Sequence, residues 1–510
     1  MQRSMIAVVG VMTVILVSVG VLRAAATPFV PYLVKDIYPG STGVYANSSA
    51  PRFGAALDST TGLLNATDGT NGSELWTTDG TAVGTVLVKD IRSGVSGSDP
   101  LLLINVGGSI FFTANDGTNG GELWKSDGST GGTVLVKDVR PGASGGVYDA
   151  MGGLTDPKFT NAAGTLFFVG SDGTNGKELW KSDGSAGGTV QVKNIHPTGD
   201  SSPDSLAAVG GTVFFKADDG TNGKELWKSD GTEAGTVLVK DIRSGSSSSS
   251  PIYTTAVGST VFFKATDGST SHGYELWKSD GTEAGTVMVK DIVSGSSGGL
   301  TLMNFMANVG GTLLLTADNS GTYTDLELWR SDGTDAGTYM VKDINPSGSS
   351  DPGRYGYYGV CGEKLFFGAD DGVHGKELWV SDGTGANTFL VKDINAGDGN
   401  GPRTFCAVGD WMFFVNETYL GSSQWEHELW VSDGTAGGTC RILDNFGYNG
   451  FFDRLFAVGD TLYFSGPTML DGTGKGVNLE LWAVTIPEPA TLALLALGGV
   501  GLLARRRRGK

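Results

Sequence analysis

Cysteine, histidine, proline and positive charge are all scarce in this 510-residue chain, which contains 3 Cys, 4 His, 16 Pro and 36 Lys and Arg. Three cysteines cannot form the disulfide framework that stabilises small secreted domains. The 54 Asp and Glu residues leave a net charge of −18, which argues against a nucleic-acid partner because phosphate binding needs clustered Lys and Arg. None of the four histidines lies in a zinc-binding pattern such as HExxH, so a zinc enzyme is also disfavoured.

Glycine and aromatic residues are abundant instead. The 82 glycines follow no collagen-like period, and 11 Trp with 23 Phe provide the apolar surface that a disordered chain lacks. The string Glu-Leu-Trp occurs nine times, with successive tryptophans 47 to 56 residues apart, a spacing typical of propeller blades. We expect these tryptophans to form a ring of contacts between blades: Trp76, Trp124, Trp180, Trp227, Trp277, Trp329, Trp379, Trp430 and Trp482.

The fourth copy of the repeat, residues 205–242, shows the unit most clearly. Gly- and Asp-rich turns divide it into four expected strands, at residues 205–209, 212–217, 225–229 and 236–241. Runs such as Val-Phe-Phe are apolar on both alternating faces, so both faces of each small sheet need cover. Radial stacking of such sheets is the β-propeller arrangement, which leaves only short and protected edges.

The two ends of the repeat array complement each other. The ninth copy stops at Leu481-Trp482 without the strand that should follow, whereas residues 32–37, with the sequence YLVKDI, supply such a strand without a preceding unit. Pairing the two would remove the free sheet edges. The sequence therefore predicts an all-β fold, a β-propeller of about nine four-stranded blades closed by N- and C-terminal strands. An open β repeat array and an eight-bladed ring are the alternatives.

Both termini have the composition of export signals. Residues 1–26 contain a short basic start, an apolar run and small residues before Thr27, as in a cleaved signal peptide, with an uncleaved anchor as the alternative. Residues 490–504 are apolar or small and precede a basic cluster, which predicts a short transmembrane helix and transient membrane anchoring. The expected domains are a signal peptide (1–26), a propeller (27–486) and a sorting segment (487–510).

The C-terminal segment resembles the PEP-CTERM sorting signal of Gram-negative bacteria that make exopolysaccharide. The resemblance is carried by a Pro-Glu-Pro tripeptide, the apolar segment and the terminal basic cluster: Pro487, Glu488, Pro489, Arg505, Arg506, Arg507 and Arg508. It implies export, processing by an exosortase, and a location in the cell envelope, on the cell surface or in the extracellular matrix.

The repeat itself resembles the ELWxxDGT family of large exported bacterial proteins, also called hyalin-like. The match spans residues 32–482 and is clearest at 225–242, ELWKSDGTEAGTVLVKDI. In the eighth copy, CRILDN at 440–445 departs from the pattern. This resemblance implies surface display and adhesion, and it assigns no catalytic residues.

Repeated polar residues give the candidate sites. Asp219, Asn222 and Glu225 present oxygen atoms that suit Ca²⁺, although Asp-Gly and Asn-Gly are equally what hairpin turns require. We therefore expect no cofactor other than Ca²⁺, with turn formation favoured over metal binding. Lys240 is expected to pair with Glu225 across strands.

Some histidines, cysteines and insertions differ from the repeated pattern. His272 and His374 occupy the turn position that Asn222 holds in the fourth copy, and the pairing of Cys361 with Cys406 is left open. Insertions in repeat proteins tend to gather on the binding face, so the longer third and sixth copies, at 146–164 and 318–326, are candidate ligand-docking regions.

The expected function is non-catalytic: a binding, adhesion or structural protein of the cell surface or extracellular matrix. Its expected partners are exosortase, the export machinery, and exopolysaccharide or other surface glycans and proteins. Two GxSxG matches, at 142–146 and 295–299, lie in Gly/Ser-rich linkers and precede no helix, so they do not support a hydrolase. A polysaccharide hydrolase or lyase with a site in the channel and a calcium-stiffened coat spacer are the alternatives.

Overall fold

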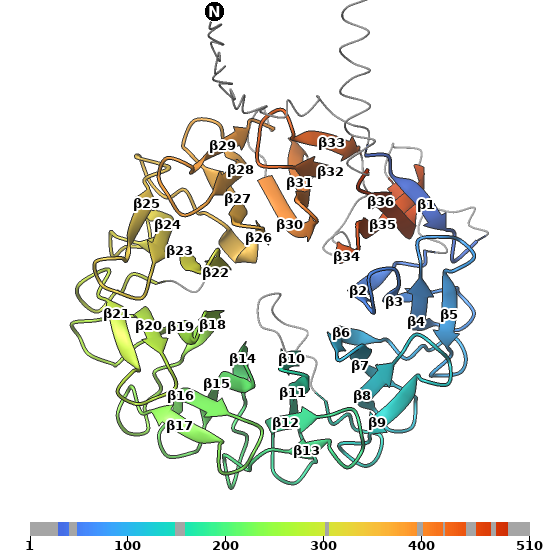
Figure 1. Cartoon of the computed structure of the whole chain (residues 1–510), viewed down its shortest axis with the longest axis horizontal. Helices are drawn as coiled ribbons and strands as arrows, with labels where there is room; N and C mark the ends of the chain where they lie inside the picture. Colours follow the sequence, from blue (N-terminus) through green and yellow to red (C-terminus); the bar gives the residue numbers. More distant parts are fainter. Residues whose placement is uncertain are drawn as a thin grey trace, which may run out of the picture. The chain divides into compact units, whose positions relative to one another are not determined.

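Nine small antiparallel sheets are arranged as a ring (Figure 1). The computed structural model describes residues 29–39, 48–147, 159–300, 305–394, 401–421, 424–444, 455–470 and 476–487. Within these ranges the regular structure is β-strand apart from one short 3₁₀ turn, η1 (Arg354–Gly356). Each sheet has four strands, so the prediction of a nine-bladed, all-β propeller is confirmed.

In blades 1 to 8 the four strands follow one another along the chain, from the centre of the ring outwards (Figure 1). Blades 1 to 3 are β2 (Arg52–Ala56), β3 (Gly62–Thr67), β4 (Ser73–Thr78), β5 (Val86–Lys89); β6 (Leu101–Val106), β7 (Ser109–Asn115), β8 (Gly121–Ser126), β9 (Val134–Lys137); and β10 (Phe159–Ala162), β11 (Thr165–Gly170), β12 (Glu178–Ser182), β13 (Val190–Gln191). Blades 4 to 6 are β14 (Asp204–Val209), β15 (Thr212–Asp218), β16 (Lys224–Ser229), β17 (Val237–Lys240); β18 (Ile252–Val257), β19 (Thr260–Ala265), β20 (Glu275–Ser279), β21 (Val287–Lys290); and β22 (Met306–Val309), β23 (Thr312–Asp318), β24 (Leu326–Ser331), β25 (Tyr339–Lys342). Blades 7 and 8 are β26 (Tyr358–Cys361), β27 (Lys364–Asp370), β28 (Lys376–Ser381), β29 (Phe389–Lys392); and β30 (Gly401–Val408), β31 (Trp411–Gly421), β32 (Gln424–Ser432), β33 (Cys440–Leu443). Blade 9 is β34 (Phe456–Val458), β35 (Thr461–Leu470), β36 (Gly476–Thr485) and β1 (Tyr32–Lys35).

The turn between the third and fourth strands explains the repeated Ser-Asp-Gly-Thr string. In blade 4, Asp230 Oδ1 accepts hydrogen bonds from the amide and the hydroxyl of Thr232, at 2.8 and 2.7 Å. The hydroxyls of Ser229 and Thr236 lie 2.8 Å apart and close the turn. Gly231 adopts φ +85°, which a side chain would strain. The string therefore specifies a turn whose polar groups bond to one another.

The core lies between the blades. Trp227 of β16 is 6% exposed and packs with Phe215 of its own blade and with Leu179 and Val192 of blade 3. Each such cluster joins two neighbouring blades, and large aromatic side chains bury roughly 150–250 Å² each. The expected ring of tryptophan contacts is present at every interface, although Trp482 is only partly buried.

Lysines at the ends of the outer strands also connect neighbouring blades. Lys240 Nζ donates to the Thr286 carbonyl of blade 5 at 2.8 Å. The prediction that it pairs with Glu225 was wrong. A register shift between Leu226 and Trp227 places Lys240 opposite Leu226, and its ammonium reaches the next blade. The same bond to the next blade recurs in Lys35, Lys89, Lys137, Lys193, Lys342 and Lys392.

The two ends of the repeat array close the ring. β1 pairs antiparallel with β36, with Tyr32 opposite Ala483 and Leu33 opposite Trp482. Lys35 Nζ then donates to the Thr85 carbonyl of blade 1 at 2.6 Å, so the closing strand makes the same contact as the other outer strands. The prediction that the N-terminal segment completes the ninth blade is confirmed.

The export segments fall largely outside the described residues. The signal peptide expected at 1–26 and the transmembrane helix expected at 490–504 both lie outside the residues that the structure describes. In the described part of the chain, the search for a helix long and apolar enough to span a membrane finds none.

Ring closure predicts unequal effects of two neighbouring substitutions. Val34 is 3% exposed and shares a cluster with Leu64 and Trp76 of blade 1. An uncompensated buried charge costs about 3–5 kcal/mol, so Val34→Asp lowers the free energy of unfolding by this order. Thermal unfolding of residues 27–486 measures the effect.

The control for this prediction is Leu33→Asp. Leu33 is 41% exposed, and substitutions at such surface positions change stability by about 0.5 kcal/mol or less. Equal losses of stability from both substitutions contradict a closing role for the segment.

Candidate functional site

Glu225 is one of the three candidate metal ligands. Its carboxylate is buried beneath the crossover segment, which is the stretch that leads from one blade to the next. Its Oε2 accepts the Ile242 amide at 3.0 Å and the Ser249 hydroxyl at 2.5 Å. Its Oε1 accepts the Ser249 amide at 2.7 Å. Both oxygens are therefore bonded to the chain itself, and they hold the crossover segment against the sheet.

The same glutamate contact recurs around the ring. In blade 9, Glu480 accepts the Ile37 amide at 2.8 Å, so the closing segment is held like a crossover segment. In blade 8, by contrast, Glu428 bonds to Trp430 Nε1 and to the Arg441 guanidinium. The other glutamates that bind a crossover amide are Glu74, Glu122, Glu178, Glu275, Glu327 and Glu377.

Burial dominates the acidity of these glutamates. Desolvation raises the pKa of Glu122, Glu225 and Glu275 to about 7, even though amide and hydroxyl donors oppose it. The charge of Asp241 raises the pKa of Glu225 further. Removing a carboxylate from water disfavours its charged form, so these groups bind protons more tightly in the folded state.

Asp219 and Asn222 form a turn. Asp219 Oδ1 accepts the Thr221 and Asn222 amides at 2.8 and 2.7 Å. Its Oδ2 accepts Asn222 Nδ2 at 2.7 Å, so the asparagine presents a donor to the aspartate. The structure thus brings Asp219 and Asn222 together and gives Glu225 other partners. Within the described ranges, the search for a group of His, Cys, Asp and Glu side chains able to hold a metal ion finds none.

Two histidines serve in equivalent turns. His374 Nδ1 lies 2.7 Å from Asp371 Oδ2, and His272 Nδ1 lies 3.2 Å from Asp267 Oδ2. These contacts correspond to that of Asn222 with Asp219, as the sequence predicted. The three cysteines are free thiols, so Cys361 and Cys406 do not pair.

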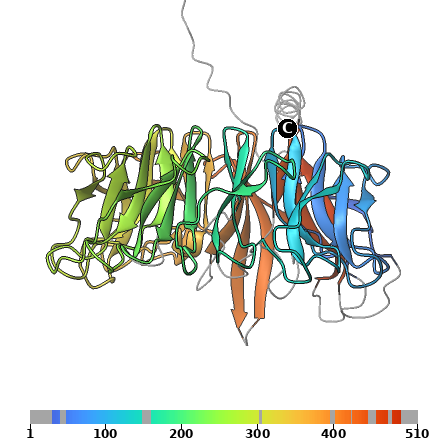
Figure 2. The same ribbon diagram turned by 90° about the horizontal axis from the view of Figure 1, so that it is seen from below.

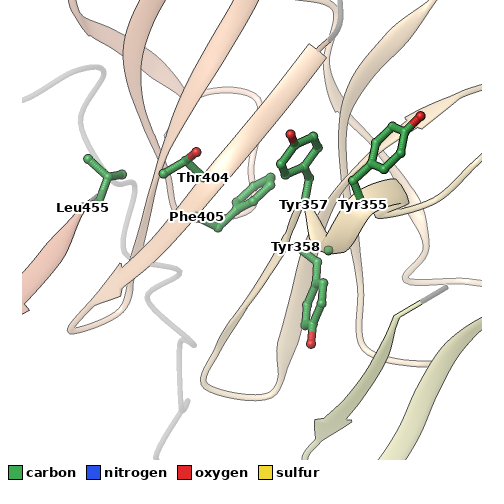
Figure 3. Close-up of a pocket in the computed structure, with 7 residues that line it drawn as sticks. Tyr355, Tyr357, Tyr358, Thr404, Phe405 and Leu455 are labelled. Carbon is green, nitrogen blue, oxygen red and sulfur yellow. The ribbon is translucent and has the colours of Figure 1, made fainter. Parts of the chain in front are cut away.

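The described surface departs from the repeat where the inner strands of blades 7, 8 and 9 meet. A cavity of about 210 Å³ lies there, shown in Figure 3, and it is lined by seven of the described residues: Tyr355, Gly356, Tyr357, Tyr358, Thr404, Phe405 and Leu455. None of the seven carries a carboxyl, imidazole, thiol or amino group in its side chain. We refer to this cavity as the aromatic pocket.

The tyrosines of the aromatic pocket stand on a strained turn. Tyr355 lies within η1 at φ +62°, a left-handed conformation that a bulky side chain rarely adopts. Its ring is 51% exposed and meets the Tyr357 ring edge-on, with centroids 6.1 Å apart. Backbone strain of this kind costs about 1–3 kcal/mol and concentrates at functional sites.

A polar network carried by β30, β31 and β32 supports the pocket. Arg403 of β30 lies over the Tyr357 ring at 5.9 Å and bonds to Glu417 Oε2 at 3.0 Å. Glu417 Oε1 lies 2.7 Å from Nε2 of His427, which is 3% exposed. β31 and β32, which carry this pair, are longer than their counterparts in blades 1 to 7 and extend beyond one face of the ring (Figure 2).

The aromatic pocket lies outside the ligand-docking regions expected in the third and sixth copies. In the third copy, residues 148–158 lie outside the described part, and in the sixth copy, residues 318–326 form a hydrogen-bonded turn around Asp318. The overlooked signal is the string RYGYY at 354–358, which introduces η1 before β26 and has no counterpart in the other copies.

Of the expected sorting residues, the structure describes Pro487, which follows the end of β36. Glu488, Pro489 and the arginines at 505–508 lie outside the described residues. The fold nevertheless defines the class of protein, a closed nine-bladed β-propeller.

Comparison with known families identifies the C-terminal segment. Residues 485–508 match the PEP-CTERM protein-sorting motif. The motif marks export and sorting to the bacterial cell envelope, with processing by an exosortase. Among curated proteins, none is significantly similar in sequence to this chain.

Solved structures with some likeness include other propellers. Puromycin hydrolase is 14% identical, with a TM-score of 0.37. The match covers 74% of this chain and 60% of the puromycin hydrolase chain. The β-propeller domain of the Trilobed protease from Pyrococcus furiosus is 10% identical, with a TM-score of 0.32, and the match covers 68% of this chain and 98% of that domain. Oligogalacturonate lyase in complex with manganese is 11% identical, with a TM-score of 0.34, and the match covers 74% of this chain and 86% of the lyase. Such low similarity carries no argument about function.

The contacts of Glu225 predict a structural role that is independent of calcium. Glu225→Ala leaves the buried Ile242 and Ser249 amides without an acceptor, at about 1–3 kcal/mol each. We expect a lower thermal midpoint, by the same amount in Ca²⁺ and in chelator. Glu233→Ala, at an exposed position of the same blade, is the control. A midpoint that falls only when calcium is removed contradicts this role and supports the metal site.

The raised pKa values predict greater stability in mild acid. A carboxyl whose pKa is about 7 when folded and 4.5 when unfolded contributes stability that is present below pH 4.5 and lost as the pH rises through 7. The thermal midpoint should therefore be several degrees higher at pH 5 than at pH 8, measured calorimetrically at constant ionic strength. An equal or lower midpoint at pH 5 contradicts the assignment.

Proposed function

We propose that this chain is an exported, exosortase-sorted propeller of the cell surface or extracellular matrix, where it acts as a non-catalytic binding or adhesion protein. On this proposal it is displayed on an envelope rich in polysaccharide, and its ligand is an exopolysaccharide or another surface glycan. The resemblance of its repeat to ELWxxDGT proteins supports the same role.

The aromatic pocket is the observation that carries the proposal. It combines an exposed tyrosine with further aromatic walls, and the titratable groups among its seven described lining residues are the phenols of three tyrosines. Histidine is the most frequent general acid or base in enzymes, and none of these seven residues is a histidine, aspartate or glutamate. Aromatic walls with few polar groups are typical of binding pockets.

The glutamates of the repeat support a structural role for the rest of the ring. The carboxylate of Glu225 and its equivalents is directed at crossover amides and buried, so these repeated acids are not exposed to a ligand. The buried Glu417 and His427 likewise bond to each other. Two alternatives remain as outcomes of the test: an enzyme acting on polysaccharide in the channel, and a coat spacer stiffened by calcium.

A glycan array combined with product analysis tests the proposal. We expect residues 27–486, purified without the terminal signals, to bind one class of surface glycan and to leave it intact after prolonged incubation. Release of shortened or unsaturated sugars supports the hydrolase or lyase alternative. Absence of binding to every glycan contradicts the binding function, and a calcium-dependent thermal midpoint in that case supports the spacer.

A further inference from the structure

We infer that the aromatic pocket recognises a neutral pyranose residue of a glycan by stacking it on Tyr355 and Tyr357. This inference rests on the proposed glycan-binding function and names the chemical class and the place of the ligand.

The pocket is small and has two aromatic walls that meet at an angle. Its volume of about 210 Å³ is below the roughly 300–1,000 Å³ of sites for drug-sized ligands. Tyr355 and Tyr357 meet at an interplanar angle of 60°, which forms a corner between two aromatic surfaces. The C–H faces of a pyranose are its apolar surfaces, and burial of apolar area against aromatic rings is favourable. One face of a sugar ring therefore fits this corner, with its hydroxyls directed to water.

The charges at the pocket favour an uncharged ligand. Arg354 lies over the Tyr355 ring at 4.9 Å and is bonded to Asp351 Oδ2 at 2.7 Å. Arg403 is bonded to Glu417. A carboxylated sugar would have to compete with these carboxylates for the guanidinium groups, within a chain of net charge −18. A neutral sugar can stack on the two tyrosine rings without breaking the bond of Arg354 to Asp351 or that of Arg403 to Glu417.

The walls of the pocket are held in place before a ligand arrives. Phe405 stacks on Phe414 at 5.7 Å, and Phe414 stacks on Trp430 at 6.4 Å, so this wall continues into the core of blade 8. Tyr358 packs on Phe305 at 4.7 Å and donates its hydroxyl to the Met306 carbonyl of blade 6 at 3.3 Å. Preorganised walls reduce the entropy lost on binding.

The experiment is a calorimetric titration of residues 27–486 with oligosaccharides of neutral hexoses and, separately, with oligouronates of equal length. We expect the neutral oligosaccharides to bind, the uronates to bind at least tenfold more weakly, and raised NaCl to leave the affinity unchanged. Tyr355→Ala should weaken binding at least tenfold, whereas Tyr355→Phe keeps the ring and should retain affinity within about threefold, a factor worth less than 1 kcal/mol.

Tyr339→Ala is the matched control. Tyr339 is 47% exposed on the outer strand β25, and Arg330 lies over its ring at 5.6 Å. Like Tyr355, it is therefore an exposed tyrosine with an arginine over its ring, but it does not line the pocket. Its removal should not change binding, and equal thermal midpoints of the two alanine variants show that both are folded.

The outcomes separate this inference from the proposed function. Neutral glycan binding that Tyr355→Ala leaves unchanged, or a preference for uronates, overturns the inference and leaves the binding function standing. Failure of the parent protein to bind any glycan overturns the proposed function, and the inference with it.

Discussion

The pairing of β1 with β36 is the contact on which the rest of the ring depends. Without it, β36 would present an unpaired edge, and the apolar surface between blades 9 and 1 would face water. The closing segment also repeats the polar contacts of the other blades. Lys35 reaches Thr85, and Glu480 holds Ile37, just as Lys240 reaches Thr286 and Glu225 holds Ile242. Hydrogen bonds are directional and apolar contacts are not. The lysine and glutamate bonds therefore fix the spacing between neighbouring blades.

Much of the fold could be predicted because it is encoded locally and repeated nine times. The strands of blade 4 lie within a residue or so of their expected bounds, since alternating apolar runs and Asp-Gly turns mark both ends of each strand. The closure followed from an offset in the repeat. The partner of Lys240 could not be predicted, because a bulge between Leu226 and Trp227 changes the register and the acceptor belongs to another blade.

The candidate site was not predicted, because its residues differ from the repeated sequence pattern on which the prediction was based. Tyr355, Thr404 and Leu455 come from three blades and about 100 residues of sequence, and they meet only because the inner strands converge on the channel. The Arg403, Glu417 and His427 network likewise needs the register of β30, β31 and β32. Repetition therefore builds the scaffold, and its few irregular residues form the candidate site.

Hydrogen exchange at the closing strand tests the central claim most directly. Amides of residues 33–37 lie in or beside β1, and the Ile37 amide is bonded to Glu480. In the exported body, mass spectrometry should show this segment exchanging as slowly as the equivalent outer strand β17, since both are paired and held by a buried glutamate. Exchange of 33–37 at the rate of an unpaired terminus, with β17 still protected, would contradict the closed ring.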